Sequence, residues 1–229
     1  MSGIIPSQHL REMIARGDIS GSPSITDEQI QPASLDLRLG QTAYRIRASF
    51  LPGSGKRVED VIAETGIELH RMPLSPQGAV LETGCVYLVP LMESVSLPAG
   101  ITGRANPKSS TGRLDIFTRV MTDHGVEFDK IPAGYRGPLY LEVSPRTFPI
   151  VVRTGSRLSQ VRFRSSDTIL GADALAALHE SQTLVAGDSP IITHAGIAVS
   201  VDLSGDADGL VGYRGKHHTA VVDVDRRDA

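Results

Sequence analysis

Two short stretches of the chain hold residue types that can do chemistry on a small charged molecule. Residues 108–113 read Lys-Ser-Ser-Thr-Gly-Arg, so small residues leave backbone N–H groups open and a cation stands at each end. Such a cluster suits an anionic group such as a phosphate. Residues 139–144 alternate apolar and polar side chains as a half-buried strand does, and Glu142 is among the polar ones. A carboxylate held on a strand can act as a general base, although the pattern alone more often indicates a surface glutamate beside a basic loop.

The size and composition of the chain limit what these residues can belong to. A chain of 229 residues has room for one large domain, or for one domain and part of another. Hydrophobic residues make up 40%, enough for a core, and 14 prolines and 23 glycines without tryptophan suit short strands joined by turns. A net charge of −3 and a pI near 6.2 argue against binding of a nucleic-acid polymer. A phosphorylated small molecule needs only local positive charge.

Cysteine and histidine usage argues against disulfides and against zinc. Cys85 is the one cysteine, and His217 and His218 are adjacent rather than spaced as metal ligands. A disulfide framework and a thiolate zinc site are therefore not expected. No apolar run approaches membrane-spanning length, and the first residues lack a signal-peptide core. We expect a soluble, cytoplasmic protein without a membrane partner.

The apolar pattern predicts a chain made mostly of short strands. A short helix is expected after Ser7, with apolar residues at helical spacing up to Gly17. Residues 41–78 are expected to be irregular, and their Gly-Ser-Gly-Lys run (53–56) to be an exposed loop, since it lacks the spacing of a phosphate-binding loop. The strand candidates lie in residues 34–39, 80–97, 114–121, 139–143, 150–153 and 158–163. Strands of this length and spacing predict an all-β barrel or sandwich.

The composition changes after residue 165, and an internal repeat is visible. Residues 173–178 predict another short helix, and Ala-Val-Ser-Val-Asp-Leu (198–203) echoes Ala-Ser-Leu-Asp-Leu (33–37). We therefore divide the chain into a first domain, 1–165, and the start of a second, truncated repeat, 166–229.

Five motifs, in their order along the chain, resemble the dCTP deaminase family of the dUTPase-like superfamily. They are Gln-Pro-Ala-Ser-Leu-Asp-Leu-Arg-Leu-Gly (31–40), Lys-Ser-Ser-Thr-Gly-Arg (108–113), Gly-Tyr-Arg-Gly (134–137), Leu-Glu-Val (141–143) and Gly-Ser-Arg-Leu-Ser-Gln-Val-Arg-Phe (155–163). The resemblance spans most of residues 4–165. It implies a dUTPase-like distorted barrel or jelly-roll with a short N-terminal helix. It also implies that the chain is the N-terminal copy of a tandem-domain bacterial form.

The resemblance also implies a chemistry, the metal-free hydrolytic deamination of dCTP to dUTP and ammonia. Glu142 matches the family's catalytic glutamate, which takes a proton from water and passes it to the leaving amine. Ser109 would position the water or the exocyclic amine, and Arg113 would place charge near the ring and orient Glu142. Phosphates would be held by Lys108, Ser110 and the backbone of Thr111 and Gly112. Magnesium is implied as the companion of the triphosphate.

Further candidate contacts with the substrate follow from the same resemblance. Thr122 matches the place where the family lines the base pocket through its backbone. Tyr135 is as well explained by filling the core as by touching the sugar. The remaining candidates are Tyr140, Leu141 and Gln160.

Two departures from the family pattern concern phosphate binding and assembly. Lys108 stands where arginine is common, which removes bidentate geometry but keeps the charge. The family's C-terminal tail, which closes over the triphosphate, has no counterpart here because the repeat begins where the tail would run. Family members form active sites between the subunits of a trimer, so we expect a homo-oligomer built on threefold symmetry.

Two other functions remain open at this stage. A dUTP diphosphatase on the same fold would carry a water-activating aspartate three residues before Tyr135, where this chain has Pro132. Asp129 could replace that aspartate if the apparent insertion of residues 124–130 shifts the register. A non-catalytic nucleotide-binding relative is the third alternative.

Overall fold

The computed structural model describes residues 3–165, 169–187, 191–194, 196–216 and 220–226. By its internal contacts the chain divides into two compact units, residues 1–166 with 215–229, and residues 167–214. Each unit is described by itself.

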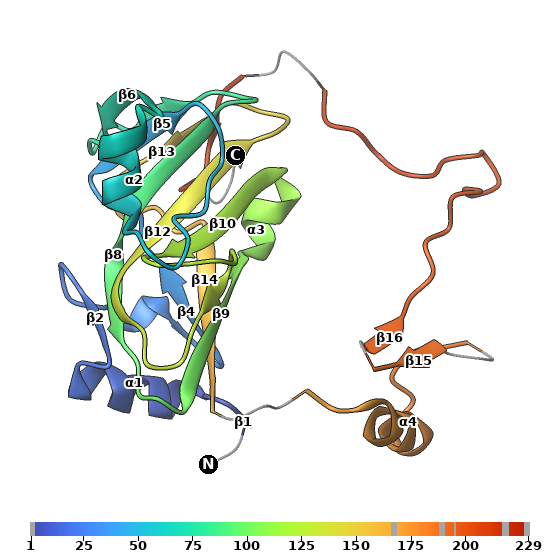
Figure 1. Cartoon of the computed structure of the whole chain (residues 1–229). Helices are drawn as coiled ribbons and strands as arrows, with labels where there is room; N and C mark the ends of the chain where they lie inside the picture. The colour runs from blue at the N-terminus through green and yellow to red at the C-terminus, as the bar shows by residue number, and fades with distance from the viewer. Residues whose placement is uncertain (1–2, 166–168, 188–190, 195, 217–219, 227–229) are drawn as a thin grey trace. The chain divides into compact units, whose positions relative to one another are not determined.

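Two large sheets and a smaller one build the first unit (Figure 1). The first sheet has the strand order β11-β9-β14-β4-β3, and β1 pairs with β14. Its strands are β1 (Gly3–Ile4), β3 (Ile30–Gln31), β4 (Ser34–Leu37), β9 (Ile101–Pro107), β11 (Lys130–Ile131) and β14 (Ser159–Ser165).

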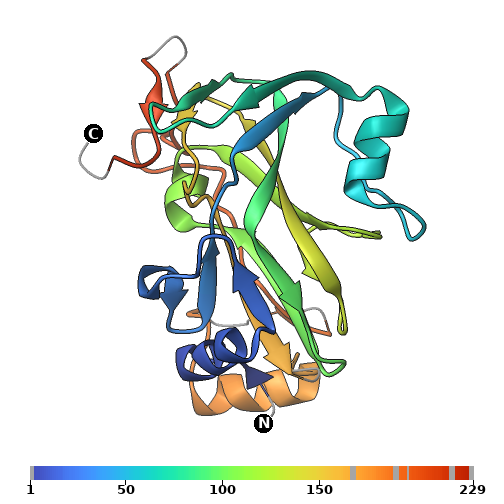
Figure 2. The same cartoon turned by 90° about the vertical axis from the view of Figure 1, so that its left-hand side faces the viewer.

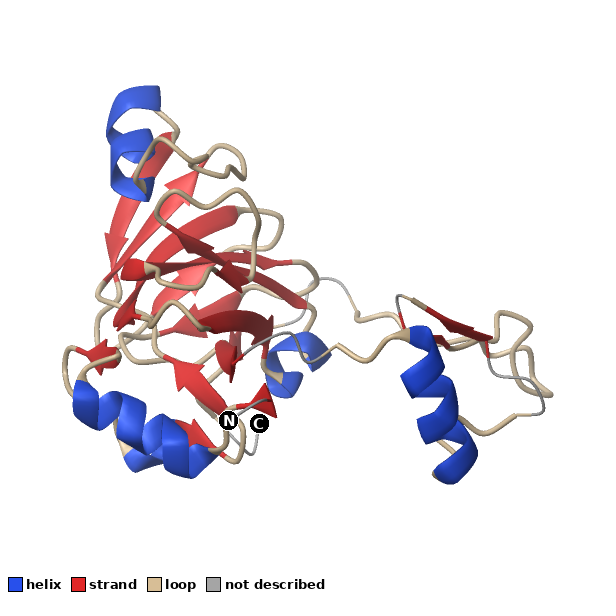
Figure 3. Ribbon diagram, turned by 60° about the horizontal axis from the view of Figure 1, so that its bottom comes forward, coloured by secondary structure: helices blue, strands red, loops and turns tan. Residues whose placement is uncertain are grey.

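The second sheet has the strand order β10-β12-β8-β5-β6, and β2 pairs with β8. Its strands are β2 (Ile19–Gly21), β5 (Thr42–Ile46), β6 (Glu68–Pro73), β8 (Val86–Ser96), β10 (Ile116–Thr122) and β12 (Arg136–Pro145). A smaller sheet joins β7 (Ala79–Leu81) and β13 (Ile150–Val152) to β17 (Val222–Asp223), which pairs with β13 in parallel. Strands are thus the main regular secondary structure of this unit (Figure 3).

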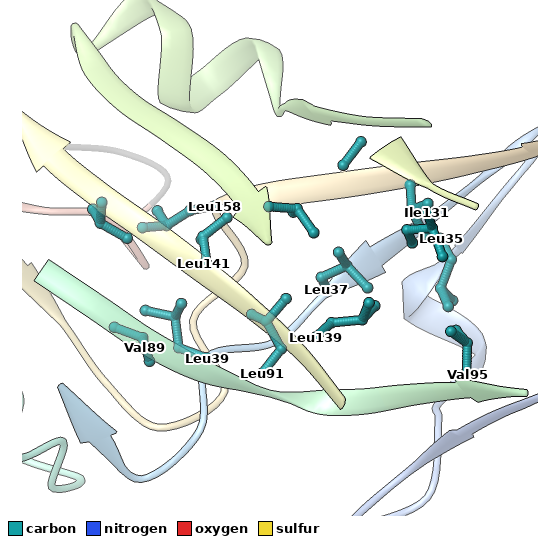
Figure 4. Close-up of a cluster of buried hydrophobic side chains, with 14 of the residues drawn as sticks. Leu35, Leu37, Leu39, Val89, Leu91, Val95, Ile131, Leu139, Leu141 and Leu158 are labelled. Atoms are coloured by element: carbon teal, nitrogen blue, oxygen red, sulfur yellow. The ribbon is translucent and has the colours of Figure 1, made fainter. Parts of the chain in front are cut away.

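The main core lies between the two large sheets, because successive side chains of a strand point to opposite faces. Leu35 and Leu37 from the first sheet and Leu139, Leu141 and Val143 from the second belong to this core, and each is at most 1% exposed. Figure 4 shows the leucines of β4 and β12 pointing into the same space. The polar residues between them therefore face outward, which decides where each candidate site residue lies.

Short helices border the sheets of the first unit. The N-terminal helix α1 (Ser7–Arg16) is confirmed, with Leu10 and Met13 buried, and it ends at Gly17 in the left-handed conformation that glycine favours (φ 80°). Pro6 rather than Ser7 is its N-cap. The others are the 3₁₀ helix Asp27–Gln29, α2 (Val58–Thr65) and α3 (Ser109–Arg113). Figure 2 shows α1 and α2 at opposite ends of the unit.

The prediction that residues 41–78 are irregular is wrong. This stretch contains β5, α2 and β6. The loop between β5 and α2, with the Gly-Ser-Gly-Lys run, is irregular and largely exposed, and residues 74–78 after β6 are irregular too. Val58, Val61 and Ile62 lie on one side of α2 at helical spacing and are buried. Val58 and Ile62 pack with Ile46, Leu88, Met121 and Tyr140 in a second apolar cluster. Since Met121 and Tyr140 face outward, α2 covers part of the outer face of the second sheet.

The second unit has little buried apolar surface. It contains α4 (Ala172–Ser181), with no buried residue, and a hairpin of β15 (Ile191–Thr193) and β16 (Gly196–Ala198). The predicted echo of the buried strand β4 forms no strand over residues 199–203, where Val201 and Leu203 are 77% and 80% exposed. In the described part of this region, the hairpin of β15 and β16 is the sheet present, and residues 199–203 do not pair with it.

The all-β prediction is confirmed, and the two large sheets pack face to face without closing into a barrel. No helix in the described part of the chain is long and apolar enough to cross a membrane.

Candidate active site

The carboxylate of Glu142 is buried on the outer face of the second sheet. Glu142 lies on β12 directly opposite Arg119 on β10, and it is 2% exposed. Arg119 donates to one carboxylate oxygen, Oε1, from Nε (3.0 Å) and Nη2 (2.6 Å). Nη2 also donates to Ser49 Oγ at 2.6 Å. A buried charge needs such a partner, and Arg119 supplies it.

Three neighbouring outward residues of β12 carry buried polar atoms without a protein partner. Among the described residues, the Tyr140 hydroxyl, Glu142 Oε2 and Ser144 Oγ accept or donate no hydrogen bond. Buried polar atoms normally find a partner, so this row points to a ligand or water as the missing one. Burial raises the pKa of Tyr140, which keeps that hydroxyl a neutral donor. The row can therefore bind and orient a polar molecule next to Glu142.

The polar residues of the 108–113 stretch gather around a second site, on the outer face of the first sheet. This site is a hollow of about 290 Å³. One residue each from β3, β4 and β14 lines it, and the rest of the lining comes from α3 and the residue before it. Its lining consists of Gln31, Asp36, Lys108, Ser109, Ser110, Arg113 and Gln160. The structure thus brings together five of the predicted residues, and we call Lys108, Ser109, Ser110 and Arg113 the basic cluster.

Local structure explains how the basic cluster is presented. Lys108 is the N-cap of the five-residue helix α3, and its backbone N–H donates to Leu158 O at 2.9 Å. Thr111 is buried, which fixes this turn of helix to the protein. The predicted turn is therefore a helical turn, with Ser109, Ser110 and Arg113 exposed.

Asp36 belongs to this hollow, and sequence reasoning did not place it there. Its carboxylate is 2% exposed and accepts a hydrogen bond from Lys108 Nζ. Arg38, the next residue but one, pairs instead with the buried Glu93, Nε to Oε1 at 2.7 Å. Asp36 therefore neutralises part of the charge that a phosphate would meet.

A single chain does not join the basic cluster to Glu142. Gln160 and Asp36 lie on the outer face of the first sheet, and Glu142 lies on the outer face of the second. Of residues 108–113, Gly112 lines the hollow that Arg119, the partner of Glu142, also lines. Among the described residues, no hydrogen bond or ion pair links Ser109 or Arg113 to Glu142. The orientation of Glu142 that the family resemblance assigned to Arg113 is supplied within the chain by Arg119.

Three further candidates, Tyr135, Leu141 and Thr122, lie on or beside the strands β10 and β12. The Tyr135 hydroxyl accepts from Asp123 N (3.0 Å) and donates to Pro138 O (2.7 Å), and burial raises its pKa to about 12. This arrangement supports the structural interpretation of Tyr135. Leu141 is 0% exposed within the main core, so only its backbone remains for a substrate contact. Thr122 is buried at the end of β10, where its Oγ1 has no partner among the described residues.

Asp129 lies beside Arg119 at a hollow of about 580 Å³ that both residues line. Its Oδ1 accepts from the backbone N–H of Val120 at 2.8 Å. Burial raises the pKa of the Asp129 carboxyl, whereas that hydrogen bond and Arg119 act in the opposite direction. Asp129 therefore ties the chain after β10 to that strand through one of its two carboxylate oxygens.

Among the described residues, no group of three or more His, Cys, Asp or Glu side chains can hold a metal ion. His217 and His218 lie outside the described residues.

Arg119 is the functional residue that sequence reasoning missed. It is the one basic residue inside the strand candidate 114–121, and that was the available signal. Its partner could not be found without the register between β10 and β12, which crosses a long connection. Phe128, whose ring centroid lies 3.7 Å from the Arg119 guanidinium, was missed for the same reason.

Known proteins resemble the whole length of this chain. The N-terminal domain of the family described as 2'-deoxycytidine 5'-triphosphate deaminase matches residues 1–167, and the C-terminal domain of that family matches residues 171–229. The crystal structure of 2'-deoxycytidine 5'-triphosphate deaminase from Agrobacterium tumefaciens is 61% identical, with a TM-score of 0.86 over 98% of this chain. The present chain spans 66% of that protein.

Two curated relatives are more distant. The dCTP deaminase of Halorubrum lacusprofundi is 29% identical over 168 residues, 70% of this chain and 76% of the relative. A protein of Methanobrevibacter smithii named dCTP deaminase, dUMP-forming, is 26% identical over 166 residues, 72% of this chain and 81% of the relative. Because the family's N-terminal domain matches residues 1–167, most of the sequence, the chain belongs to the 2'-deoxycytidine 5'-triphosphate deaminase family.

Proposed function

We propose that this chain acts as a deaminase that converts dCTP and water into dUTP and ammonia. The observation that carries the proposal is the state of Glu142. Its side chain is 2% exposed, Arg119 holds Oε1, and Oε2 is buried without a partner among the described residues. A carboxylate fixed in this way can accept a proton from water without first reorienting. The names of the relatives, which are dCTP deaminases, support the same reaction.

The reaction needs two proton transfers, and Glu142 can perform both. Glu142 takes one proton from water while the water oxygen bonds to C4 of cytosine, and this proton passes to N3 of the ring. Glu142 then takes the proton of the new C4 hydroxyl and gives it to the amine. The C4–N bond breaks, ammonia leaves, and a carbonyl remains at C4. Both water protons are thus accounted for, one on N3 and one on ammonia, and Glu142 is again a carboxylate.

The basic cluster supplies substrate binding in this proposal. The phosphates are held by Lys108, Ser110 and the backbone of Thr111 and Gly112. Charge-assisted hydrogen bonds contribute most of the affinity for the phosphates. Ser109 positions the water or the amine, and Arg113 lies near the reacting ring. Magnesium arrives with the triphosphate as part of the substrate. Such nucleotides are formed in the cytoplasm, and we place the enzyme there.

A second copy of the chain completes the site. Within one chain the basic cluster and Glu142 lie on the outer faces of different sheets, so each copy offers one half to a neighbour. A closed ring of such head-to-tail contacts needs rotational symmetry, and we propose a homotrimer. Light scattering should find a trimer or a multiple of it, and a stable, active monomer would contradict the proposal.

For the domain organisation we propose a first domain of residues 1–165 followed by a second region, residues 166–229, that repeats its opening pattern. Helices α1 and α4 both have ten residues and open their regions, which supports this. The described residues of the second unit bury little apolar surface, so they should not fold as an independent core. Hydrogen exchange should show weak protection there, and a separately cooperative unit would disprove it.

A dUTP diphosphatase activity is the second candidate because Asp129 is a partly buried carboxylate in a hollow beside Arg119. One relative is named a dUMP-forming dCTP deaminase. Against this, Pro132 stands at the diphosphatase aspartate position and lacks a carboxylate. A non-catalytic nucleotide-binding role would leave the unpartnered Glu142 Oε2 without a purpose.

One incubation separates these functions. The protein is mixed with dCTP and Mg²⁺, and ammonia and nucleotides are measured together over time. We expect equal amounts of ammonia and dUTP, with dUTP accumulating. Conversion of added dUTP to dUMP and pyrophosphate as the chief reaction would replace the deaminase proposal. Binding of dCTP without products would indicate the non-catalytic role.

A further inference from the structure

Arg119 contacts Glu142 in an unusual way for an arginine beside a carboxylate. An arginine usually engages both oxygens in a two-pronged pair. Here Nε and Nη2 both donate to Oε1, at 3.0 and 2.6 Å, and Oε2 receives nothing among the described residues. The two oxygens of Glu142 are therefore unequal, one held and one open to a partner.

Three segments of the chain hold Arg119 in this position. Its guanidinium carbon lies 3.7 Å from the centre of the Phe128 ring and 5.0 Å from that of Phe117. Its Nη2 also donates to Ser49, in the loop after β5. Stacking on aromatic rings suits the planar guanidinium and restricts its rotation. The direction from which Arg119 approaches Glu142 is thus fixed by its surroundings.

The segment that carries Phe128 is itself anchored. Asp129 accepts a hydrogen bond from Val120 N at 2.8 Å, which ties the end of this segment to β10. Gly53 N donates to Gly125 O at 3.0 Å, which ties its start to the loop after β5. Residues 124–130 form the apparent insertion noted in the sequence. A segment absent from the shorter family pattern therefore braces the residue that holds Glu142.

We propose that Arg119 is a positioning residue for Glu142, and that Phe128 locks it in place. By holding Oε1, Arg119 directs the free Oε2 towards the water that attacks the ring. This inference rests on the proposed deaminase function. It assigns to residues 124–130 a part in catalysis that involves no contact with the substrate.

A matched pair on the surface shows what a structural role alone would look like. Arg71 also donates to a glutamate from Nε and Nη2, at 3.1 and 2.9 Å, and lies 4.8 Å from an aromatic ring, that of Tyr44. It uses both oxygens of Glu68, however, and its side chain is 59% exposed. Arg71→Ala is therefore the control for Arg119→Ala.

The test is chemical rescue. In Arg119→Ala we expect kcat for ammonia release to fall about 100-fold, the cost of a misplaced catalytic group, while KM changes less than about threefold. Guanidinium ion at millimolar concentration fits between the two rings and should restore kcat at least about tenfold. Arg71→Ala should match the wild type and should not respond to guanidinium. Near-normal kcat in Arg119→Ala, or a folded variant that guanidinium does not rescue, would overturn the proposal.

Phe128→Leu keeps an apolar side chain but removes the ring. Its kcat should fall about fivefold, and in the double variant with Arg119→Ala this loss should disappear, because Phe128 acts through Arg119. Fully additive losses would refute the locking role.

The wild-type assay separates a failure of this inference from a failure of the function. If the wild type releases no ammonia from dCTP, the proposed function fails. The infrared carboxylate band of Glu142, identified by its loss in Glu142→Gln, then still tests the positioning. Arg119→Ala must shift this band and guanidinium must reverse the shift, and an unchanged band would overturn the inference.

Discussion

The two halves of the proposed site differ in how much of their structure one chain supplies. Glu142 is 2% exposed, opposite its own Arg119, with rings and a loop fixing that partner. The basic cluster lines an open hollow, where Ser109, Ser110 and Arg113 are exposed. The half proposed to move protons therefore has its ion-pair partner already in place in the folded chain. The half proposed to bind phosphates stays open to a ligand.

The electrostatics of the two halves follow the same division. The charge of Glu142 is balanced within its own face by Arg119, whose side chain is 26% exposed. In the basic cluster Asp36 balances only Lys108, and among the described residues Arg113 has no ion-pair partner. Leaving a solvent-exposed cation unpaired costs little free energy, and the cation attracts an anion. Leaving a buried carboxylate unpaired would cost far more free energy. This difference explains why the buried Glu142 has an ion-pair partner in the chain, whereas the exposed Arg113 needs none.

The largest effect is expected from Glu142→Gln. The amide keeps the shape of the side chain but cannot accept the proton of water, so kcat for ammonia release should fall by about 10³-fold or more. The Kd for dCTP, measured by calorimetry, should change little because the phosphates bind at the other half.

The control for this variant is Glu64→Gln. Glu64 pairs with Lys56 on the exposed side of α2, and its side chain is 57% exposed. Its replacement should leave kcat unchanged. Near-normal turnover in Glu142→Gln would instead return Glu142 to the surface-glutamate interpretation.

A smaller effect, on binding alone, is expected from Lys108→Gln. Loss of one cation beside the phosphates should raise KM for dCTP about tenfold and leave kcat nearly unchanged. The control is Lys56→Gln, because Lys56 lies outside the basic cluster and pairs with the exposed Glu64. A fall in kcat without a change in KM would show that the basic cluster does more than bind phosphates.

The smallest effect is expected from Asp36→Asn. The substitution removes the charge that Lys108 now faces, so the lysine should attract phosphates more strongly and KM should fall about twofold to threefold. The melting temperature must be recorded alongside, since Asp36 is buried. A rise in KM would mean that Asp36 orients Lys108 rather than competing for it.

Local pattern was enough to predict much of the fold. The alternation in residues 139–143 predicted which side chains enter the core, and Leu139, Leu141 and Val143 are all buried there. The helix ending at Gly17 followed from apolar spacing and the glycine stop. By contrast, α2 was missed because a glycine-rich loop precedes it and its apolar run is short.

The contacts of the site residues could not be predicted, because they join residues far apart in sequence. Arg119 and Glu142 meet through the strand register, and Lys108 meets Asp36 across 72 residues. Sequence reasoning placed Glu142 and Arg113 together by family resemblance, whereas one chain keeps them on separate faces. The arrangement of the sheets supports the proposal that two copies form the site, which the family resemblance also implies.

The most direct test of this arrangement mixes two inactive variants. Glu142→Gln and Arg113→Gln are each expected to be inactive, since each lacks one half of the site. Co-expressed with different tags and purified through both, they form mixed oligomers in which some sites pair an intact Glu142 with an intact basic cluster. If sites form between neighbouring copies of a trimer, each doubly tagged oligomer has one intact site out of three, so activity should return to about one third of the wild type. Mixed oligomers that stay as inactive as the separate variants would contradict a shared site.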